Sequence, residues 1–172
     1  MRNLISLSLA SLILGCNQSS PQAHSFIVDI SSSNEATINE SLEKIVDLYL
    51  ESGPNDNFRI YFFSSVKYLA YSGNKLSKDR EFKGMIYEGY QKAKKIEVKS
   101  GTSFDVCKGI LESSSGNIVL LTDGYFENST LSKVKLNKQS KLKIIGLNIA
   151  NNERILNCFD DGTNISVDFK KL

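Results

Sequence analysis

The sequence predicts an α/β fold in which six strands form one doubly wound, mostly parallel sheet with one antiparallel edge strand and helices on both faces. From residue 25 onward, short apolar runs alternate with amphipathic stretches, as in strands separated by helices. Residues 118–121, Ile-Val-Leu-Leu, form an unbroken β-favouring run, which fits a strand buried on both faces. Residues 58–63 and 66–71 are both strand-like but lie too close together for a parallel crossover, so they should pair as an antiparallel hairpin.

The other elements follow in order along the chain. Residues 26–30 are the first strand, and the spacing Thr37-Ile38-Asn39-Glu40 predicts a capping box at the start of a helix. The apolar face of that helix is expected to contain Ile38, Leu42, Ile45, Val46 and Tyr49. Further helices are expected at residues 79–95, 104–111, 129–139 and 153–159, and further strands at residues 142–149 and 165–169. Together these elements make a Rossmann-like sheet.

The first residues have the order of a secretory signal sequence. Arg2 supplies a positive charge, and residues 4–14 are apolar apart from three serines. As a helix they would span only about 17 Å, short of a hydrocarbon core of roughly 30 Å, so export is a better interpretation than a transmembrane helix. Ile13-Leu14-Gly15-Cys16 resembles the bacterial lipobox, which implies cleavage of a signal peptide at residues 1–15 and lipidation of Cys16.

The polar residues 16–24 are then expected to tether a single domain, residues 25–172, to a membrane of the bacterial cell envelope. Asn17 after the lipidated cysteine favours, by the same resemblance, the periplasmic leaflet of the outer membrane. A buried N-terminal helix or strand is the alternative. With Cys16 lipidated, two cysteines would keep their thiols, Cys107 and Cys158, and both a disulfide and two separate buried thiols are compatible with the sequence.

Charge and composition exclude several classes of function. The 21 basic and 19 acidic side chains give a net charge of +2, which provides no strongly basic surface for nucleic acid. His24 is the only histidine and no Cys-x-x-Cys pair occurs, so a multi-histidine zinc site is excluded and a histidine-dependent triad is disfavoured. His24 also falls in the expected tether, where nothing would hold it as a catalytic base.

Oxygen-donor side chains recur at positions that a parallel sheet would bring together. Asp29, Ser31 and Ser33 lie at the end of the first strand, Thr102 precedes a helix, and Asp123 follows the buried strand. Residues two apart at the end of an extended strand point to the same side. In doubly wound sheets, ligands bind beyond the carboxyl ends of the strands, where the strand order reverses. We therefore expect these five side chains to meet in one crevice.

These fragments resemble the metal-ion-dependent adhesion site of von Willebrand factor type A domains in order and placement, and the resemblance covers the chain from about residue 25. It implies Mg²⁺ or Mn²⁺, bound directly by Ser31, Ser33 and often Thr102, and by Asp29 and Asp123 directly or through water. It also implies that an acidic residue of a protein partner completes the coordination. The segments after Asp123 are short for this family.

The donor set suits a cation that is shared with a partner. Magnesium prefers six oxygen ligands and keeps several waters. Two carboxylates cancel its charge, and three hydroxyls add coordination without charge, so the ion can still attract an outside carboxylate. The predicted function is therefore metal-dependent protein binding.

Two other functions remain open. One is a metal-independent scaffold domain of the same fold, and the other is a metal-assisted hydrolase. An aspartyl phosphatase would usually need a second carboxylate where Ser31 stands, Ser103 lies in no Gly-x-Ser-x-Gly elbow, and no phosphate-binding glycine loop occurs. We therefore predict that the protein is not an enzyme.

Overall fold

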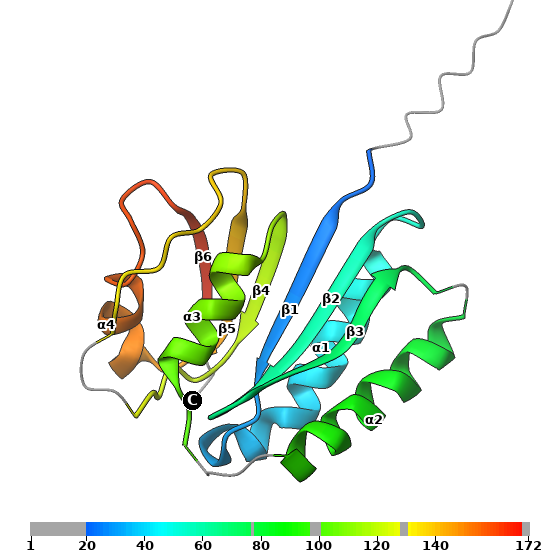
Figure 1. The fold of residues 1–172 in the computed structure, drawn as a ribbon, viewed down its shortest axis with the longest axis horizontal. Coiled ribbons are helices and arrows are strands. Elements are labelled where there is room, and N and C mark those ends of the chain that lie inside the picture. The colour runs from blue at the N-terminus through cyan, green and yellow to red at the C-terminus, as the bar shows by residue number, and fades with distance from the viewer. Residues whose placement is uncertain (1–19, 77, 97–100, 128–130, 170–172) are drawn as a thin grey trace, which may run out of the picture.

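Six strands form one sheet in the computed structural model, which describes residues 20–76, 78–96, 101–127 and 131–169 (Figure 1). The sheet order is β3-β2-β1-β4-β5-β6, and every neighbouring pair is parallel except β2 with β3 at one edge. The predicted doubly wound sheet with one antiparallel edge strand is therefore confirmed. The strands are β1 (Ala23–Asp29), β2 (Asn57–Phe63), β3 (Lys67–Asn74), β4 (Asn117–Leu121), β5 (Lys141–Leu147) and β6 (Asn164–Phe169).

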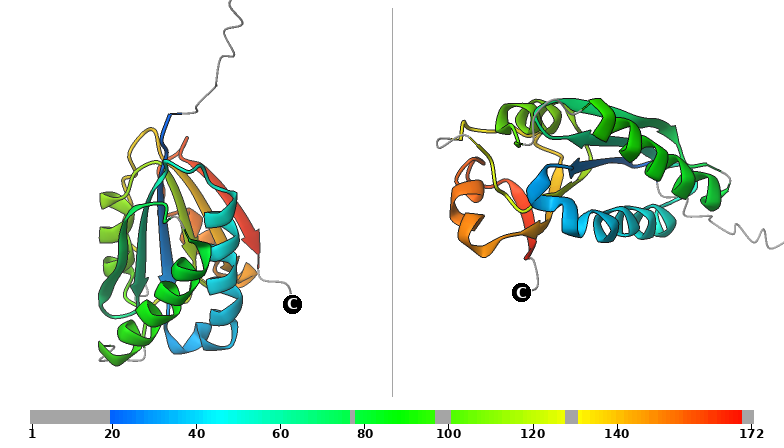
Figure 2. Two further views of the ribbon diagram at one scale, coloured as in Figure 1. Left: turned by 90° about the vertical axis from the view of Figure 1, so that its right-hand side faces the viewer. Right: turned by 90° about the horizontal axis from the view of Figure 1, so that it is seen from below.

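Helices cover both faces of the sheet (Figure 2). α1 (Ile38–Glu51) and α2 (Asp79–Ile96) pack on one face, whereas α3 (Phe104–Ser113) and α4 (Asn152–Leu156) pack on the other. The side chains of β1 alternate between the two cores: Phe26 and Val28 join the first, and Ile27 joins the second. The chain runs from β1 to one edge of the sheet and then from β4 to the other, so the strand order reverses between β1 and β4.

α1 buries the five apolar side chains that the sequence places on its inner face. The predicted capping box does not form at its start. The chain enters α1 from a 3-10 turn, η1 (Ser32–Thr37), and Thr37 Oγ1 donates a hydrogen bond of 3.1 Å to the carbonyl oxygen of Asn34 instead. The loop that follows Asp29 therefore leads into α1 without an extended segment.

The helix predicted at residues 129–139 is wrong where the structure describes it, since residues 131–139 contain none; residues 128–130 lie outside the described residues. Val134 is buried and forms an isolated parallel bridge with Phe159, and its amide donates a hydrogen bond of 2.7 Å to the carbonyl oxygen of Cys158. Leu131 and Leu136 also pack against the second core. Tertiary packing of these apolar side chains therefore outweighs the helical propensity of the lysines between them.

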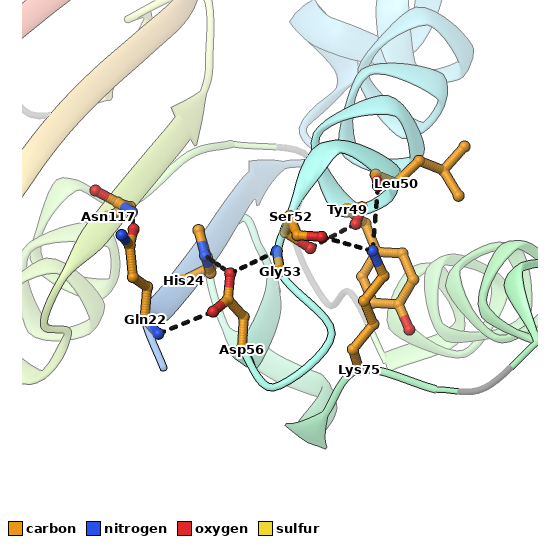
Figure 3. Close-up of polar contacts among 9 residues, drawn as sticks. All are labelled: Gln22, His24, Tyr49, Leu50, Ser52, Gly53, Asp56, Lys75 and Asn117. Carbon is orange, nitrogen blue, oxygen red and sulfur yellow. Dashed lines mark hydrogen bonds and ion pairs between the residues drawn. The ribbon is translucent and has the colours of Figure 1, made fainter. Parts of the chain in front are cut away.

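β1 begins at Ala23, two residues inside the segment predicted to be a tether. Asp56, which precedes β2, holds this start of the strand (Figure 3). Its carboxylate accepts hydrogen bonds of 2.9 Å from the amides of Gln22 and Gly53 and lies 2.9 Å from Nε2 of His24. The expectation that nothing holds His24 is therefore wrong, because its ring is fixed by Asp56 and stacks on Phe58.

Two further side chains, those of Asn117 and Lys75, tie the same end of the sheet together. Nδ2 of Asn117, the first residue of β4, donates to Oε1 of Gln22 at 2.8 Å. Nζ of Lys75 donates to the carbonyl oxygens of Leu50 and Ser52 at the end of α1 (Figure 3). Burial acts to raise the pKa of Asp56, but the hydrogen bonds from Gln22, His24 and Gly53 hold it below its usual value.

We predict that Asp56→Asn lowers the free energy of unfolding by about 1–3 kcal/mol at pH 7, because it weakens three hydrogen bonds to a charged acceptor. The folded pKa of Asp56 is depressed, so this stabilisation is present above the unfolded pKa and is lost as the pH falls through the folded value. Urea denaturation at neutral and acidic pH measures the effect. Asp161→Asn, in an exposed turn, is the control, and an Asp56→Asn deficit that persists undiminished in acid would contradict the assignment.

Candidate metal centre

The candidate ligands lie beyond the carboxyl ends of β1 and β4, at the lower edge of the sheet in Figure 1. Asp29 is the last residue of β1, Asp123 is the second residue after β4, and Thr102 lies two residues before α3. β1 and β4 are adjacent and parallel, so their carboxyl ends fall at the same edge. The crevice is thus at the point where the strand order reverses, as expected for this class of sheet.

A tight turn brings the first three candidates together. The amide of Ser31 donates a hydrogen bond of 3.0 Å to Oδ1 of Asp29, and the hydroxyls of Ser31 and Ser33 lie 3.1 Å apart. This geometry differs from the extended strand end that the spacing suggested, because β1 stops at Asp29 and the 3-10 turn begins at Ser32. The turn nevertheless brings Asp29, Ser31 and Ser33 together, as the spacing predicts. Ser31 is buried and Ser33 is exposed.

Thr102 joins this cluster from another part of the chain. Its Oγ1 lies 3.4 Å from Oδ1 of Asp29, and the residue is only 2% exposed. Two backbone hydrogen bonds hold its loop, one from Ser103 to the carbonyl oxygen of Ser64 and one from Glu127 to that of Thr102. The hydroxyl of Ser103 accepts from the amide of Val106 and so caps α3.

Asp123 is linked to the turn after Asp29 by a residue that the sequence analysis missed. Oδ1 of Asp123 accepts hydrogen bonds from the amide of Tyr125 at 3.0 Å and from Nδ2 of Asn34 at 3.4 Å. Asn34 follows Ser33 in the same 3-10 turn, so its amide group bridges the loops after β1 and β4. The structure thus gathers all five candidates at one edge, and their role as metal ligands stays a prediction.

Thr122 is the second missed residue. Its Oγ1 donates a hydrogen bond of 2.8 Å to Oδ2 of Asp29 and accepts one of 3.1 Å from the amide of Gly124. Gly124 has a φ of +77°, and a Cβ there would lie 2.4 Å from a methyl of Leu147, so the turn requires glycine. The only sequence signal for Thr122 was its place beside Asp123, because the contact to Asp29 depends on strand pairing.

The site concentrates negative charge. Asp29 is 1% exposed, and burial raises its pKa to about 6 although Ser31 and Thr122 donate hydrogen bonds that lower it; the nearby Asp123 raises it further. Within the described ranges, neither carboxylate forms an ion pair with a basic side chain. A buried carboxylate beside a second one is costly without a counter-charge.

The donor chemistry fits a divalent cation. Two carboxylates would balance its charge, and the hydroxyls of Ser31, Ser33 and Thr102 are hard oxygen donors of the kind that Mg²⁺ prefers. In the part of the chain that the structure describes, no three His, Cys, Asp or Glu side chains are grouped so that they could hold a metal ion. A cation bound here would therefore depend on the hydroxyls as ligands.

No family model matches the sequence, and no curated protein does. The structure is similar to a von Willebrand factor type A protein from Catenulispora acidiphila (12% identity, TM-score 0.56), over 86% of this chain and 38% of that one. It is also similar to proximal thread matrix protein 1 from the mussel byssus, solved with a zinc-occupied MIDAS (metal-ion-dependent adhesion site) motif, at 16% identity and TM-score 0.54, over 87% of this chain and 42% of that one.

A third similar structure is an aerotolerance-related membrane protein from Bacteroides fragilis (14% identity, TM-score 0.51), over 74% of this chain and 68% of that one. This chain spans less than half the length of the first two proteins. At these identities the similarities establish the fold, which is that of a von Willebrand factor type A domain. The residue roles still depend on the geometry described above.

We predict that, without divalent cations, Asp29 destabilises the folded protein by about 3 kcal/mol once the pH exceeds its folded pKa, as the difference between 3.8 and about 6 implies. The folded pKa lies above the unfolded one, so the folded state binds the proton more tightly. Stability should therefore fall as the pH rises from about 4 to 6.

Urea denaturation of the wild type and of Asp29→Asn across this pH range, after removal of divalent cations, checks this prediction. The amide that replaces the carboxyl group cannot titrate, so the difference in stability between the two proteins should grow with pH and then level off above about pH 6. A difference that does not depend on pH would show that Asp29 titrates as an ordinary exposed carboxyl group.

Proposed function

We propose that this chain, with its von Willebrand factor type A fold, binds a protein partner through a divalent cation held by Asp29, Ser31, Ser33, Thr102 and Asp123. The observation that carries the proposal is the convergence of these side chains around a buried carboxylate with no basic partner among the described residues. A bound Mg²⁺ or Mn²⁺ would supply a positive centre that attracts a carboxylate of the partner.

The candidate ligands differ in how far they are buried, so they would have different roles in the site. Asp29, Ser31 and Thr102 are buried and form the base of the site, whereas Ser33 is exposed and Asp123 is half-buried, so the partner would approach from their side. Thr122 and Ser31 hold the two oxygens of Asp29 through hydrogen bonds, and Asn34 and Tyr125 hold Oδ1 of Asp123. These contacts keep both carboxylates oriented before a cation or a partner arrives.

Binding is better supported than catalysis. A hydrolase would need a general base near the site, and His24 instead lies at the opposite edge of the sheet, paired with Asp56. Position 31, where a phosphatase would carry its second carboxylate, is a serine whose hydroxyl contacts Ser33. We therefore propose an interaction domain and not an enzyme.

We further propose that the protein is anchored in the bacterial cell envelope through a lipid on Cys16. No helix in the described ranges is long and apolar enough to cross a bilayer. The similarity to a membrane protein of Bacteroides fragilis is consistent with an envelope location. β1 starts at one edge of the sheet and ends in the candidate site at the other (Figure 1), so an anchor before residue 20 would leave the site facing away from the membrane.

Cation binding is tested by isothermal titration of the cation-free protein with Mg²⁺ and Mn²⁺. We expect Ser31→Ala and Asp123→Ala each to weaken binding by about tenfold or more, since each removes one of few protein ligands. Ser115→Ala and Asp161→Ala, which change the same residue types at exposed positions outside the candidate ligand set, should bind as the wild type does. Equal affinity in all five proteins would rule out this site.

Partner binding is tested by capture from envelope extract with Mg²⁺ present or chelated. The proposal expects proteins that the wild type retains only with Mg²⁺ and that Asp123→Ala does not retain. An identical set of captured proteins in every lane would favour the metal-independent scaffold instead.

For the anchor, we predict that metabolic labelling with palmitate marks the wild type and not Cys16→Ser, because acylation of the new N-terminal cysteine requires its thiol. The variant should also leave the membrane fraction. Cys107→Ser is the control, since Cys107 is buried in the domain. Labelling that survives in Cys16→Ser would disprove the assignment.

A further inference from the structure

Exposed apolar side chains gather at the edge of the sheet that carries the candidate site. In the described part of the chain, the large hydrophobic side chains that are exposed are Leu50, Val66, Leu69, Ile96, Tyr125, Ile149 and Phe169. All except Leu50 and Leu69 lie in turns, at the end of β6 or at the end of α2, on the side of the molecule where the carboxyl ends of β1 and β4 hold the candidate site. This side faces the viewer in the right-hand view of Figure 2. Single exposed hydrophobic residues are ordinary, but two of these, Tyr125 and Ile149, lie next to a candidate ligand in the structure.

Tyr125 and Ile149 are the most exposed of these side chains, at 61% and 62%. Both are fixed next to Asp123. The amide of Tyr125 donates a hydrogen bond of 3.0 Å to Oδ1 of Asp123. The amide of Asn148, the residue before Ile149, donates one of 3.0 Å to the carbonyl oxygen of Asp123. The side chain of Asn148 also accepts a hydrogen bond from the amide of Ala150 and so caps the short turn that begins at Ile149.

This anchoring sets the two side chains apart from ordinary surface residues. The backbones of Tyr125 and of Asn148, which precedes Ile149, are bonded to the residue that would bind the cation, so a ligand that contacts the two side chains orders little additional chain. Neither side chain contributes to the cores, and neither is a candidate metal ligand. Their fixed exposure beside Asp123 is therefore unexplained by folding or by cation binding.

We propose that Tyr125 and Ile149 form an apolar rim that binds the residues next to the partner's acidic residue. The inference rests on the proposed function and narrows the partner to a protein segment in which Asp or Glu is flanked by apolar side chains. The carboxylate would reach the cation while its neighbours cover Tyr125 and Ile149. Aromatic anchors beside a charged contact typically contribute much of the binding energy of an interface.

Synthetic peptides provide the probe. One set carries a central Asp flanked by Leu and Phe, a second carries the same Asp flanked by Ser, and a third replaces the Asp of the first set with Asn. Fluorescence anisotropy in Mg²⁺ should show the first set binding the wild type about tenfold more tightly than the second, a difference equivalent to one well-packed apolar contact. The third set should not bind.

The variants Tyr125→Ser and Ile149→Ser test the rim directly. The preference for apolar flanks should fall to about twofold or less in each variant. Ile149 makes none of the hydrogen bonds that hold the candidate ligands, so the Mg²⁺ affinity of Ile149→Ser by titration should match that of the wild type. Leu50→Ser and Leu69→Ser are matched controls, because they remove side chains that are 45% and 49% exposed at other positions. Both controls should keep the full preference.

The peptide experiments distinguish failure of the apolar rim from failure of the proposed cation-dependent binding. Equal binding of the Leu/Phe and Ser peptides would overturn the rim and leave cation-dependent recognition intact. Failure of every Asp peptide would overturn both. If the rim instead inserts into lipid, phosphatidylglycerol vesicles will retain the wild type better than Tyr125→Ser even in chelator, and that result would also overturn the proposal.

Discussion

The buried carboxylate of Asp29 is the constraint on which the candidate site depends. It ends β1, it is 1% exposed, and it accepts hydrogen bonds only from hydroxyl and amide groups among the described residues. Three loops supply those donors: Ser31 follows β1, Thr102 precedes α3, and Thr122 follows β4. A group that is costly to bury thus organises every loop around it, and the raised pKa of Asp29 reflects that cost.

β1 connects the cluster around Asp56 to the candidate site. At its start, Asp56 binds Gln22, His24 and the turn after α1, and at its end Asp29 reaches the candidate site. β1 pairs in parallel with β2 on one side and with β4 on the other. A pulling force between an N-terminal anchor and a bound partner would therefore act along β1, which is hydrogen-bonded to a neighbouring strand on each side. This arrangement suits a tethered binding domain.

Sequence patterns predicted what depends on local periodicity. The inner face of α1, the buried run at 118–121 and the hairpin of β2 with β3 all follow from the spacing of apolar residues. The five candidate ligands could be chosen because parallel strands place their carboxyl ends together. The roles of Asn34, Thr122 and Asp56 could not be predicted in the same way, since each contacts residues far away in the sequence. Local propensity predicts a helix at 129–139, but in the described residues 131–139 the packing of Val134 against Phe159 outweighs it.

The distribution of charge indicates how a partner would be selected. The whole chain carries a net charge of only +2, so under the proposed function long-range attraction of a partner would be weak and recognition would be local. At the site, a cation neutralised by Asp29 and Asp123 would still bind a carboxylate of the partner. Any other accessible Mg²⁺ site would do the same, so a single carboxylate contact discriminates little between one partner protein and another. The neighbouring apolar side chains of Tyr125 and Ile149 add a requirement that a free acid or an isolated surface carboxylate does not meet. Affinity would then come from the cation and specificity from the surface beside it.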